Sequence, residues 1–470
     1  MKTVRSAALA MIVALLPALS HAAELNGATL SVVWAVPFAG LLLSIALLPL
    51  LLPNFWHHHF GKVTAAWSLA FLIPLVLTYG MGAAVANFVH ALLAEYLPFV
   101  ILLTALYVVA GGIYIRGSLT GTPMLNTAIL AIGAVLASFM GTTGASMLLI
   151  RPLIRANAHR TRVVHIVVFF IFIVSNAGGS LTPLGDPPLF LGFLKGVDFS
   201  WTLLHIWPQA LFLVGVLLAI FFVLDSWLIK HDGKQQSAPV SEQARESLGF
   251  DGKFNFLLLG AIVGLVLLSG MWKSPVVFDV AGTEVGLPGV VRDIGLVAVA
   301  VLSLVLTPKL VHANNQFGWG PMAEVAKLFA GIFLTIIPVI AMLKAGVDGP
   351  FASIVRAVTN ADGTPNIGMY FWATGALSSF LDNAPTYLVF FNTAGGDPAV
   401  LMTALAPTLV AISAGAVFMG ANSYIGNAPN LMVKAIAEDR GVRMPSFFGY
   451  MLWSVGILVP LFVLMTWIWF

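Results

Sequence analysis

The sequence predicts an all-α polytopic membrane protein made of two inverted-topology repeats, each with a re-entrant hairpin and a broken transmembrane helix. Apolar composition, an asymmetric distribution of basic residues and an internal repeat predict this fold. The 470 residues are 59% hydrophobic and only 9% charged, whereas soluble domains carry about 25% charged residues. Most of the chain must therefore face lipid. From Ala28 onward, apolar runs form about ten segments long enough to span or half-span the bilayer core.

The composition also excludes several classes of function. The chain contains no cysteine, so it cannot form disulfides, thiolate metal sites or a cysteine nucleophile. The polar segments between the apolar runs are too short for a soluble domain. The net charge is +3 and the pI about 9.1, but in a membrane protein the positions of the charges matter more than their sum. We therefore expect a lipid bilayer as the main surroundings and no nucleic acid partner.

Residues 1–22 have the pattern of a secretory signal peptide. Lys2 and Arg5 precede an apolar stretch, and the small residues Ser20 and Ala22 follow it. The stretch is short for a spanning helix, which favours a cleaved signal over an uncleaved first helix, the alternative interpretation. Both interpretations place the protein in a bacterial envelope, as a multi-pass inner-membrane protein.

The basic residues predict the topology. With Ala23 outside and the segments alternating, fifteen Lys and Arg residues fall in cytoplasmic loops and five on the periplasmic side; Lys2 and Arg5 complete the 22. This bias is expected of cytoplasmic loops, and it places the C-terminus in the periplasm. This distribution of basic residues is obtained only if two segments turn back without crossing the membrane.

These two segments are predicted to be re-entrant hairpins. Met124–Leu153 enters from the cytoplasm and turns at Gly141-Thr142-Thr143-Gly144, whereas Gly368–Asn392 enters from the periplasm. Irregular backbone at membrane depth is tolerated only where protein or a water-filled cavity surrounds it, so both tips should line a cavity. The polar segment 230–253 is predicted to be a cytoplasmic linker between a first repeat, 23–229, and a second, 254–470.

An offset of 241 residues relates the two repeats. Ser138-Phe139-Met140 corresponds to Ser379-Phe380-Leu381, and Thr182–Pro188 corresponds to Ser423–Pro429. We interpret this as a duplication. Because the hairpins enter from opposite faces, the repeats are predicted to have opposite orientations. Transporters of that kind bind their substrates where the repeats meet, between discontinuous helices.

One helix in each repeat is predicted to break within the membrane. The first runs from Val163 to Val174, breaks at SNAGGSLTPLGDPP and resumes to Leu194. The second runs from Pro407 to Met419, breaks at GANSYIGNAPN and resumes over Leu431–Ala437. Breaks rich in Asn, Ser and Gly in corresponding positions point to a binding site.

Asp186 and Asp382 are the acidic residues predicted to lie deep in the membrane, where a carboxylate is a functional candidate by default. The alternative is that Asp186 caps the resumed helix. Hard oxygen donors around the two carboxylates suit a hard cation such as Na⁺, although any single hydroxyl could instead satisfy broken-helix backbone. The candidate ligands for an ion or substrate, with Asp186 and Asp382 holding transported Na⁺, are Thr142, Thr143, Ser175, Asn176, Thr182, Asp186, Asp382, Asn383, Asn422, Ser423 and Asn427.

Two other motifs are given less weight. His57-His58-His59 could bind a metal, but no acidic residue lies near it, and a solvated loop is the simpler interpretation. The PLGDP motif at Asp186 invites comparison with intramembrane aspartyl proteases, but Pro183 and Leu381 stand where that motif carries Gly and Tyr. The protease remains a remote alternative.

At SNAGGSLTPLGDPP, SSFLDNAPTY and GANSYIGNAPNLMVKAIAE the chain resembles NhaD-type sodium/proton antiporters and the neighbouring citrate transporters of the ion-transporter superfamily. The resemblance covers most of the chain after the signal. It implies a scaffold domain, a transport domain with elevator-like motion, and homodimerisation. It also implies a site containing Asn176, Asp186, Asp382 and Asn383. The chain departs from the antiporter pattern at its first hairpin tip, which has Gly141-Thr142-Thr143 where antiporters carry an acidic residue.

We therefore expect a secondary active transporter rather than an enzyme, without a cofactor. The first hypothesis is sodium/proton antiport, with Asp186 and Asp382 alternately binding Na⁺ and H⁺. The second is Na⁺- or H⁺-coupled transport of citrate or a similar small carboxylate. Anion transport would favour several helix N-termini and a basic residue in the site; no basic residue is predicted at membrane depth, which favours the antiporter.

Overall fold

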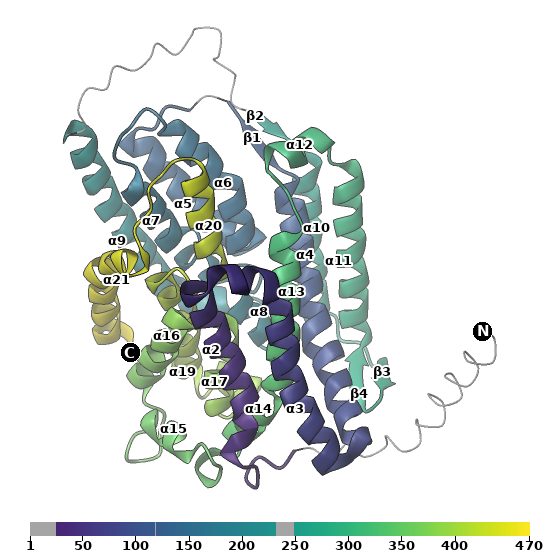
Figure 1. The fold of residues 1–470 in the computed structure, drawn as a ribbon. Coiled ribbons are helices and arrows are strands. Elements are labelled where there is room, and N and C mark those ends of the chain that lie inside the picture. Colours follow the sequence, from purple (N-terminus) through teal and green to yellow (C-terminus); the bar gives the residue numbers. More distant parts are fainter. Residues whose placement is uncertain (1–24, 118, 232–248) are drawn as a thin grey trace. The chain divides into compact units, whose positions relative to one another are not determined.

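The computed structural model describes residues 25–117, 119–231 and 249–470. The predicted signal peptide and most of the predicted linker lie outside these ranges. Within them, eight helices are long and apolar enough to cross a membrane, or nine if one bent pair is counted as a span. The protein is therefore a polytopic helical membrane protein, as predicted (Figure 1).

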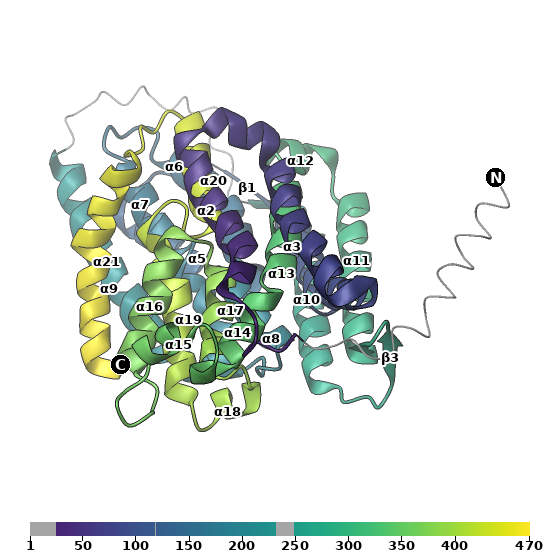
Figure 2. The ribbon, with the colours of Figure 1, turned by 60° about the horizontal axis from the view of Figure 1, so that its bottom comes forward.

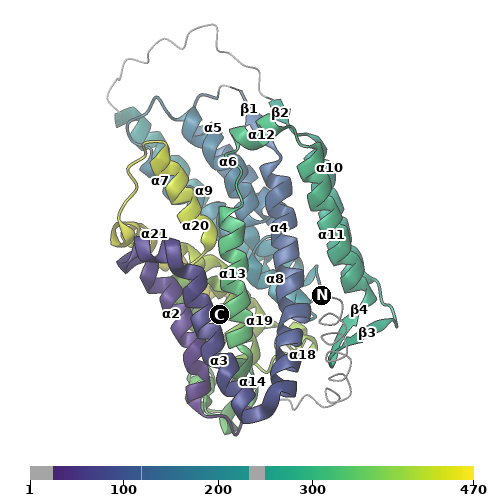
Figure 3. The ribbon, with the colours of Figure 1, turned by 45° about the vertical axis from the view of Figure 1, so that its right-hand side comes forward.

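The chain forms two compact units, each drawn from several stretches of sequence. Of the described residues, the first comprises 25–102, 268–294 and 320–355. In it, α13 (Gly320–Thr335) packs against α2 (Val36–Leu51) and α3 (Pro53–His90), as Figure 3 shows. A π-helix (Ala91–Tyr96) follows α3, and β3 (Val277–Val280) pairs antiparallel with β4 (Thr283–Gly286). Helix α14 (Ile337–Lys344) bends by 42° from α13 next to Pro338.

The second unit comprises the described residues among 103–267, together with 295–319 and 356–470. It contains the strands β1 (Tyr114–Arg116) and β2 (Gly249–Asp251), which pair antiparallel, so the described end of the predicted linker is a strand. Three helices, α4 (Leu97–Gly111), α10 (Phe254–Met271) and α11 (Leu287–Leu306), are divided between the units, as is the short α15 (Ala352–Ala357). The remaining helices of this unit are α5 (Pro123–Met140), α6 (Thr142–Ala156), α7 (Val164–Ile173), α8 (Pro187–Leu194), α9 (Trp201–His231), α12 (Lys309–Asn314), α16 (Ile367–Phe380), α17 (Asn383–Thr393), α18 (Pro398–Met402), α19 (Ala406–Met419), α20 (Ala428–Asp439) and α21 (Phe447–Trp469).

Both predicted hairpins are pairs of contacting helices joined by a very short turn. Helices α5 and α6 meet at Gly141 alone, whose φ of 79° is easily adopted only by glycine. The turn is shorter than predicted, because Thr142, Thr143 and Gly144 already belong to α6. Helices α16 and α17 meet at Leu381-Asp382. Side-chain caps fix where the first helix of each pair begins: Thr122 accepts a hydrogen bond from Leu125 N, and Asn366 accepts one from Met369 N.

Both predicted helix breaks are present. Helix α7 ends at Ile173, a 3-10 turn spans Ala177–Leu181, and α8 resumes at Pro187. Helix α19 ends at Met419, a 3-10 turn spans Gly420–Asn422, and α20 resumes at Ala428. Each resumed helix has a proline within its first two residues, where a missing N–H costs no hydrogen bond.

The resumed helices pack against elements of the other half of the sequence. Helix α20 contacts α6 and α7, and α8 contacts α17 and α19. In Figure 1, α5, α6 and α7 lie toward the upper end of this unit and α16, α17 and α19 toward its lower end. The last helices of the two halves also touch, since the rings of Phe212 on α9 and Trp469 on α21 are 5.4 Å apart (Figure 2). The two halves thus interlock around their broken helices.

Candidate ion and substrate site

Four helix N-termini meet at the carboxylate of Asp186. Thr142, the first residue of α6, donates its hydroxyl to Asp186 Oδ1 at 3.0 Å, and Asn383, the first residue of α17, donates its amide to Oδ2 at 2.5 Å. Asn427, which directly precedes α20, donates to Oδ1 at 3.1 Å. Asp186 itself directly precedes α8. These four residues are at most 2% exposed, so the centre is shielded from the surroundings.

A second layer of amides holds this centre in place. Asn427 also approaches Asn176 Oδ1 at 3.3 Å, and Asn176 donates to Ile171 O and to Asn430 Oδ1, both at 2.8 Å. Asn430 in turn donates to the carbonyls of Gly420 and Ser423 at 2.9 Å. The amides therefore connect the first helix break directly to the second.

Corresponding hydroxyls in the two halves make the same local contacts. Thr182 donates to Ser138 O and Ser423 donates to Ser379 O, in both cases across 44 residues. Leu184 N donates to the Thr182 hydroxyl and Ile425 N to the Ser423 hydroxyl, both at 3.2 Å. Thr182 and Ser423 thus satisfy hairpin and break backbone, the alternative that the sequence left open for single hydroxyls.

Glycines at corresponding positions allow the backbone of each break to fold back on itself. A Cβ atom at Gly185 would lie 2.1 Å from Gly179 O, and one at Gly426 would lie 2.5 Å from Gly420 O. No side chain fits at such distances, so both breaks need glycine for close backbone approach. Positions 241 residues apart in the two breaks therefore share the same close backbone approach as well as the same residue type.

The two carboxylates differ in what they bind. The Asp186 side chain makes no hydrogen bond to the start of α8, so the alternative interpretation, a side-chain cap on that helix, does not hold. Asp382 does cap its helix, since its Oδ1 accepts from Ala384 N at 3.0 Å. Among the described residues, Asp186 accepts hydrogen bonds only from neutral side chains, and no Lys, Arg or His donates to it. Its charge is balanced by amide and hydroxyl dipoles and by helix N-termini.

The other predicted residues make no side-chain hydrogen bond to Asp186. Ser175 exchanges a 2.9 Å hydrogen bond with Ser146. Asn422 donates to the Ser379 hydroxyl at 3.0 Å, and its Oδ1 is buried without a partner, as is Oδ1 of Asn383. Thr143 is half-buried and makes no side-chain hydrogen bond within the described ranges. The structure therefore joins Thr142, Asn176, Asp186, Asn383 and Asn427 directly and leaves Thr143 and Asn422 outside this network.

Sequence reasoning missed several buried polar residues. Asn430 is fully buried in the centre of the amide network; it is the final Asn of GANSYIGNAPN, and this position could have indicated its role. Asp186 and Asp382 are also not the only acidic residues within the apolar segments, because Asp225 on α9 and Glu95 in the π-helix are 0% and 7% exposed. Near a helix end, hydropathy alone does not distinguish a buried acid from one that reaches water.

The histidine triplet gives no metal site. His57 and His58 are exposed at the start of α3, and His58 Nδ1 approaches Asn54 O at 2.8 Å. The part of the chain that the structure describes contains no cluster of three or more His, Cys, Asp or Glu side chains arranged to hold a metal ion. The triplet is helical rather than a loop, but its exposure agrees with the simpler interpretation.

Comparison with known proteins supports a transport role. Residues 27–470 match the family model described as "Putative citrate transport". The chain belongs to this family. The match covers both halves, both breaks and the whole candidate site, and it places the chain among membrane transporters rather than intramembrane proteases. None of the curated proteins matches the chain.

Proposed function

We propose that the protein is a secondary active transporter that carries a citrate-like organic anion across the bacterial inner membrane, coupled to H⁺ or Na⁺ at Asp186. The family description favours this function over sodium/proton antiport, the first hypothesis from the sequence.

The convergence of four helix N-termini carries this proposal. Helices α6, α8, α17 and α20 all begin at residues that are hydrogen-bonded to one another through Asp186. The N-terminus of a helix carries a partial positive charge, which favours a carboxylate without a basic side chain. Here the charge matters more than free N–H groups, because α8 opens with Pro187 and Pro188 and Thr142 N already donates to Gly185 O. The lack of a Lys or Arg among the described residues of the site therefore does not argue against an anionic substrate, contrary to the expectation from the sequence.

Asp186 couples the two ions in this proposal. As an anion, it uses the Thr142 hydroxyl and the amides of Asn383 and Asn427 as its own donors, and it repels a second carboxylate nearby. A proton or Na⁺ on Asp186 cancels this charge and frees donors for the substrate. The unpartnered Oδ1 of Asn383 is a further oxygen available to a cation. Binding of the anion and the cation then becomes mutually dependent.

The proposed topology has two inverted repeats with re-entrant hairpins. It is supported by the charge asymmetry, by the matching contacts of Thr182 and Ser423 and by the reciprocal packing of α8 and α20. In such a transporter the site opens to one side of the membrane at a time. The C-terminus would lie in the periplasm.

Sodium/proton antiport of the NhaD type is the second candidate, favoured by one observation. Asp382 lies in the turn at the tip of the second hairpin, next to Asn383, which bonds Asp186. Two carboxylates close to one site could exchange Na⁺ for H⁺ without an anion. The first hairpin tip, Gly141-Thr142, adds a hydroxyl and no charge, which weakens this candidate.

Thermal unfolding of the purified protein tests the proposed substrate. A ligand that binds only the folded protein at 100 times its Kd stabilises it by about 2.7 kcal/mol. We expect citrate, in the presence of Na⁺ or at low pH, to raise the unfolding temperature in a saturable manner, whereas chloride at equal ionic strength does not. A rise with Na⁺ or Li⁺ alone and no further rise with citrate or other carboxylates would favour the antiporter.

A further inference from the structure

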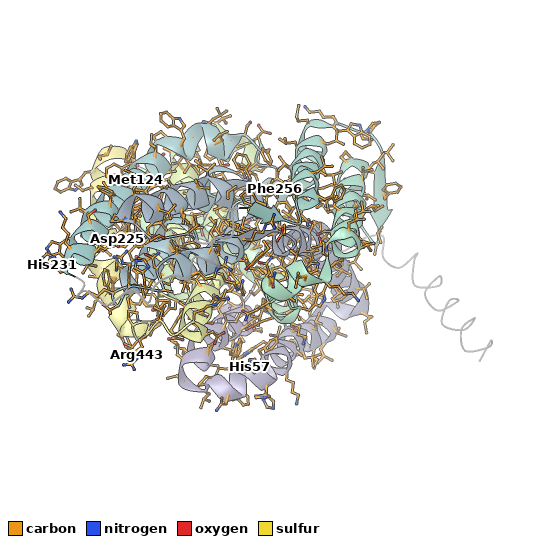
Figure 4. All side chains as sticks on the ribbon, turned by 90° about the horizontal axis from the view of Figure 1, so that it is seen from above. His57, Met124, Asp225, His231, Phe256 and Arg443 are labelled. Carbon is orange, nitrogen blue, oxygen red and sulfur yellow. The ribbon has the colours of Figure 1, made fainter. Side chains whose placement is uncertain are left out.

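A buried polar cluster far from Asp186 takes no part in the proposed function. Asp225 on α9 is fully buried and accepts hydrogen bonds from three side chains: Arg160 at 2.6 Å, His165 at 2.7 Å and Asn126 at 3.0 Å. Asn126 and Asn157 also exchange two amide hydrogen bonds, at 2.9 and 2.8 Å. Figure 4 labels Asp225 together with Met124 at the start of α5 and His231 at the end of α9. Charged groups buried within a membrane segment are costly and seldom without purpose.

The cluster holds both legs of the first hairpin at its open end. Asn126 lies in the first turn of α5, and Asn157 directly follows α6. Arg160 in the following loop donates to Asn157 Oδ1 at 3.2 Å as well as to Asp225. Through Asp225 the legs are joined to α9, and through His165 to α7. The opposite end of this hairpin carries Thr142, about 21 Å away along α5.

The second hairpin lacks a matching cluster among the residues that the structure describes. The positions 241 residues after the five members are occupied by Ile367, Pro398, Leu401, Ala406 and Thr466. Thr466, the counterpart of Asp225, accepts one neutral hydrogen bond, from Trp372 Nε1 at 2.9 Å. Both terminal helices thus bond to the first helix of their hairpin, but within the described ranges only α9 does so through a buried charged residue; the Asn360–Asn366 network at the start of α16 is exposed and does not include α21.

The tips of the two hairpins also differ, both in burial and in their bonds to the helix break. Gly141 and Thr142 are buried, and Thr142 N donates to Gly185 O at 2.8 Å, which ties the first tip to the break. At the second tip Leu381 and Asp382 are partly exposed, and the Asp382 side chain bonds only within its own hairpin. The first hairpin is therefore bonded at its open end and at its tip, whereas the second is bonded along α16, where Ser378 donates to Ala416 O and Ser379 to Met419 O, but its tip residues Leu381 and Asp382 are not tied to the break.

We propose that Asp225 is a positioning residue that clamps the first hairpin as a fixed wall of the site, and that the second hairpin, α16–α17, is the one that opens. The clamp keeps Thr142 on Asp186 while the second hairpin moves Asn383 on and off the same carboxylate. This inference follows from contacts alone and does not depend on which ion or anion is carried. An asymmetric opening of this kind gives one moving gate within a duplicated fold.

Cysteine labelling tests the clamp, because the chain has no native cysteine. Ser138 and Ser379 are counterparts in the two hairpins, and both are buried, at 1% and 4% exposure. Cysteine at either position should react with a membrane-permeant maleimide only when its hairpin opens. We expect Ser379→Cys to label faster than Ser138→Cys. Asp225→Asn should then raise the Ser138→Cys rate by at least about tenfold, because it leaves a buried arginine without its carboxylate, and should leave the Ser379→Cys rate unchanged.

Two further variants are needed, a matched control and a milder substitution in the cluster. Thr466→Val removes the matched hydrogen bond of the second half and should not alter labelling of Ser138→Cys. If Asp225→Asn prevents folding, Asn126→Ala removes only the bond from α5 and should give the same selective increase on a smaller scale. An unchanged Ser138→Cys rate in a folded variant would overturn the proposal. So would an equal increase at both cysteines, which would mean that the cluster only stabilises the unit as a whole. Labelling needs no substrate, so loss of citrate transport alone does not decide the result.

Discussion

Asp186 and Asn427 occupy corresponding positions in the two halves of the chain, 241 residues apart, and are hydrogen-bonded to each other at 3.1 Å. The contact joins the first helix break to the second, so it marks a place where the two halves meet. The duplicated position carries a carboxylate in one half and its neutral isostere in the other. One half therefore supplies the charge, and the other supplies a donor to hold it.

Asp186→Asn removes the charge and keeps the shape. We expect coupled transport to fall to background, because the site can no longer bind a cation or exchange a proton. The new amide N–H group would also face the side chains that donate to Asp186, so one hydrogen bond is lost, which costs about 1–3 kcal/mol of stability. Uptake into proteoliposomes and thermal unfolding measure the two effects. Ser180→Ala is the control, since the Ser180 hydroxyl bonds only Ala177 O beside the same break; it should be milder, and an equal loss of uptake would mean that packing rather than charge matters.

Asn427→Asp places a second carboxylate against Asp186. Like charges at this separation repel, and one proton shared between them relieves the repulsion. The variant should therefore be destabilised at pH 8 and recover toward pH 5, as thermal unfolding at the two values would show. Combining it with Asp186→Asn moves the charge to the other half and should restore stability at pH 8. Transport should remain impaired in the combined variant, because Thr142 and Asn383 still donate to position 186. A pH-independent loss of stability would show that the two side chains are not in direct contact.

Gly185→Ala and Gly426→Ala test the matching geometry of the breaks. Each new methyl group would overlap a backbone oxygen, at 2.1 and 2.5 Å. Overpacking of this kind costs about 1–3 kcal/mol or more, so both variants should unfold at clearly lower temperature. Gly456→Ala on α21 is the matched control, because nothing lies within 4 Å of the position that its new methyl group would occupy and alanine favours a helix. Normal stability of both break variants would contradict the described fold of the breaks.

Thr142→Cys and Asn383→Cys test the inverted orientation. The hairpins are proposed to enter from opposite faces, so we expect the first cysteine to label more readily from the cytoplasm and the second from the periplasm. Membrane-impermeant reagents applied to right-side-out and inside-out vesicles make this comparison. Labelling of both cysteines from one side under every condition would contradict the inverted repeat.

Much of the fold could be predicted from the sequence because its signals are local. Apolar length predicts the spans, Gly and Pro predict the breaks at Ser175–Pro188 and Gly420–Asn430, and the repeat predicts which residues correspond. Thr142, Asn176, Asp186, Asn383 and Asn427 were identified in this way, since polar residues at a break within the membrane are unusual.

The remaining features depend on packing between distant segments. No local pattern shows that Asp186 accepts hydrogen bonds from three other elements, whereas the cap that Asp382 makes to Ala384 N is local. The Asp225 cluster joins residues up to 99 positions apart, and each member taken singly resembles an ordinary charged residue at a helix end. The contribution of helix N-termini to anion binding was likewise underestimated, because their convergence is visible only in three dimensions.

Citrate flux with an internal pH dye tests the central claim most directly. Proteoliposomes containing the protein would be challenged in turn with citrate, Na⁺, Li⁺ and K⁺ while citrate uptake and internal pH are recorded. The account predicts uptake of citrate that depends on a proton or Na⁺ gradient and that is lost in Asp186→Asn. Sodium-dependent proton release in the absence of citrate, with no citrate uptake under any gradient, would contradict it.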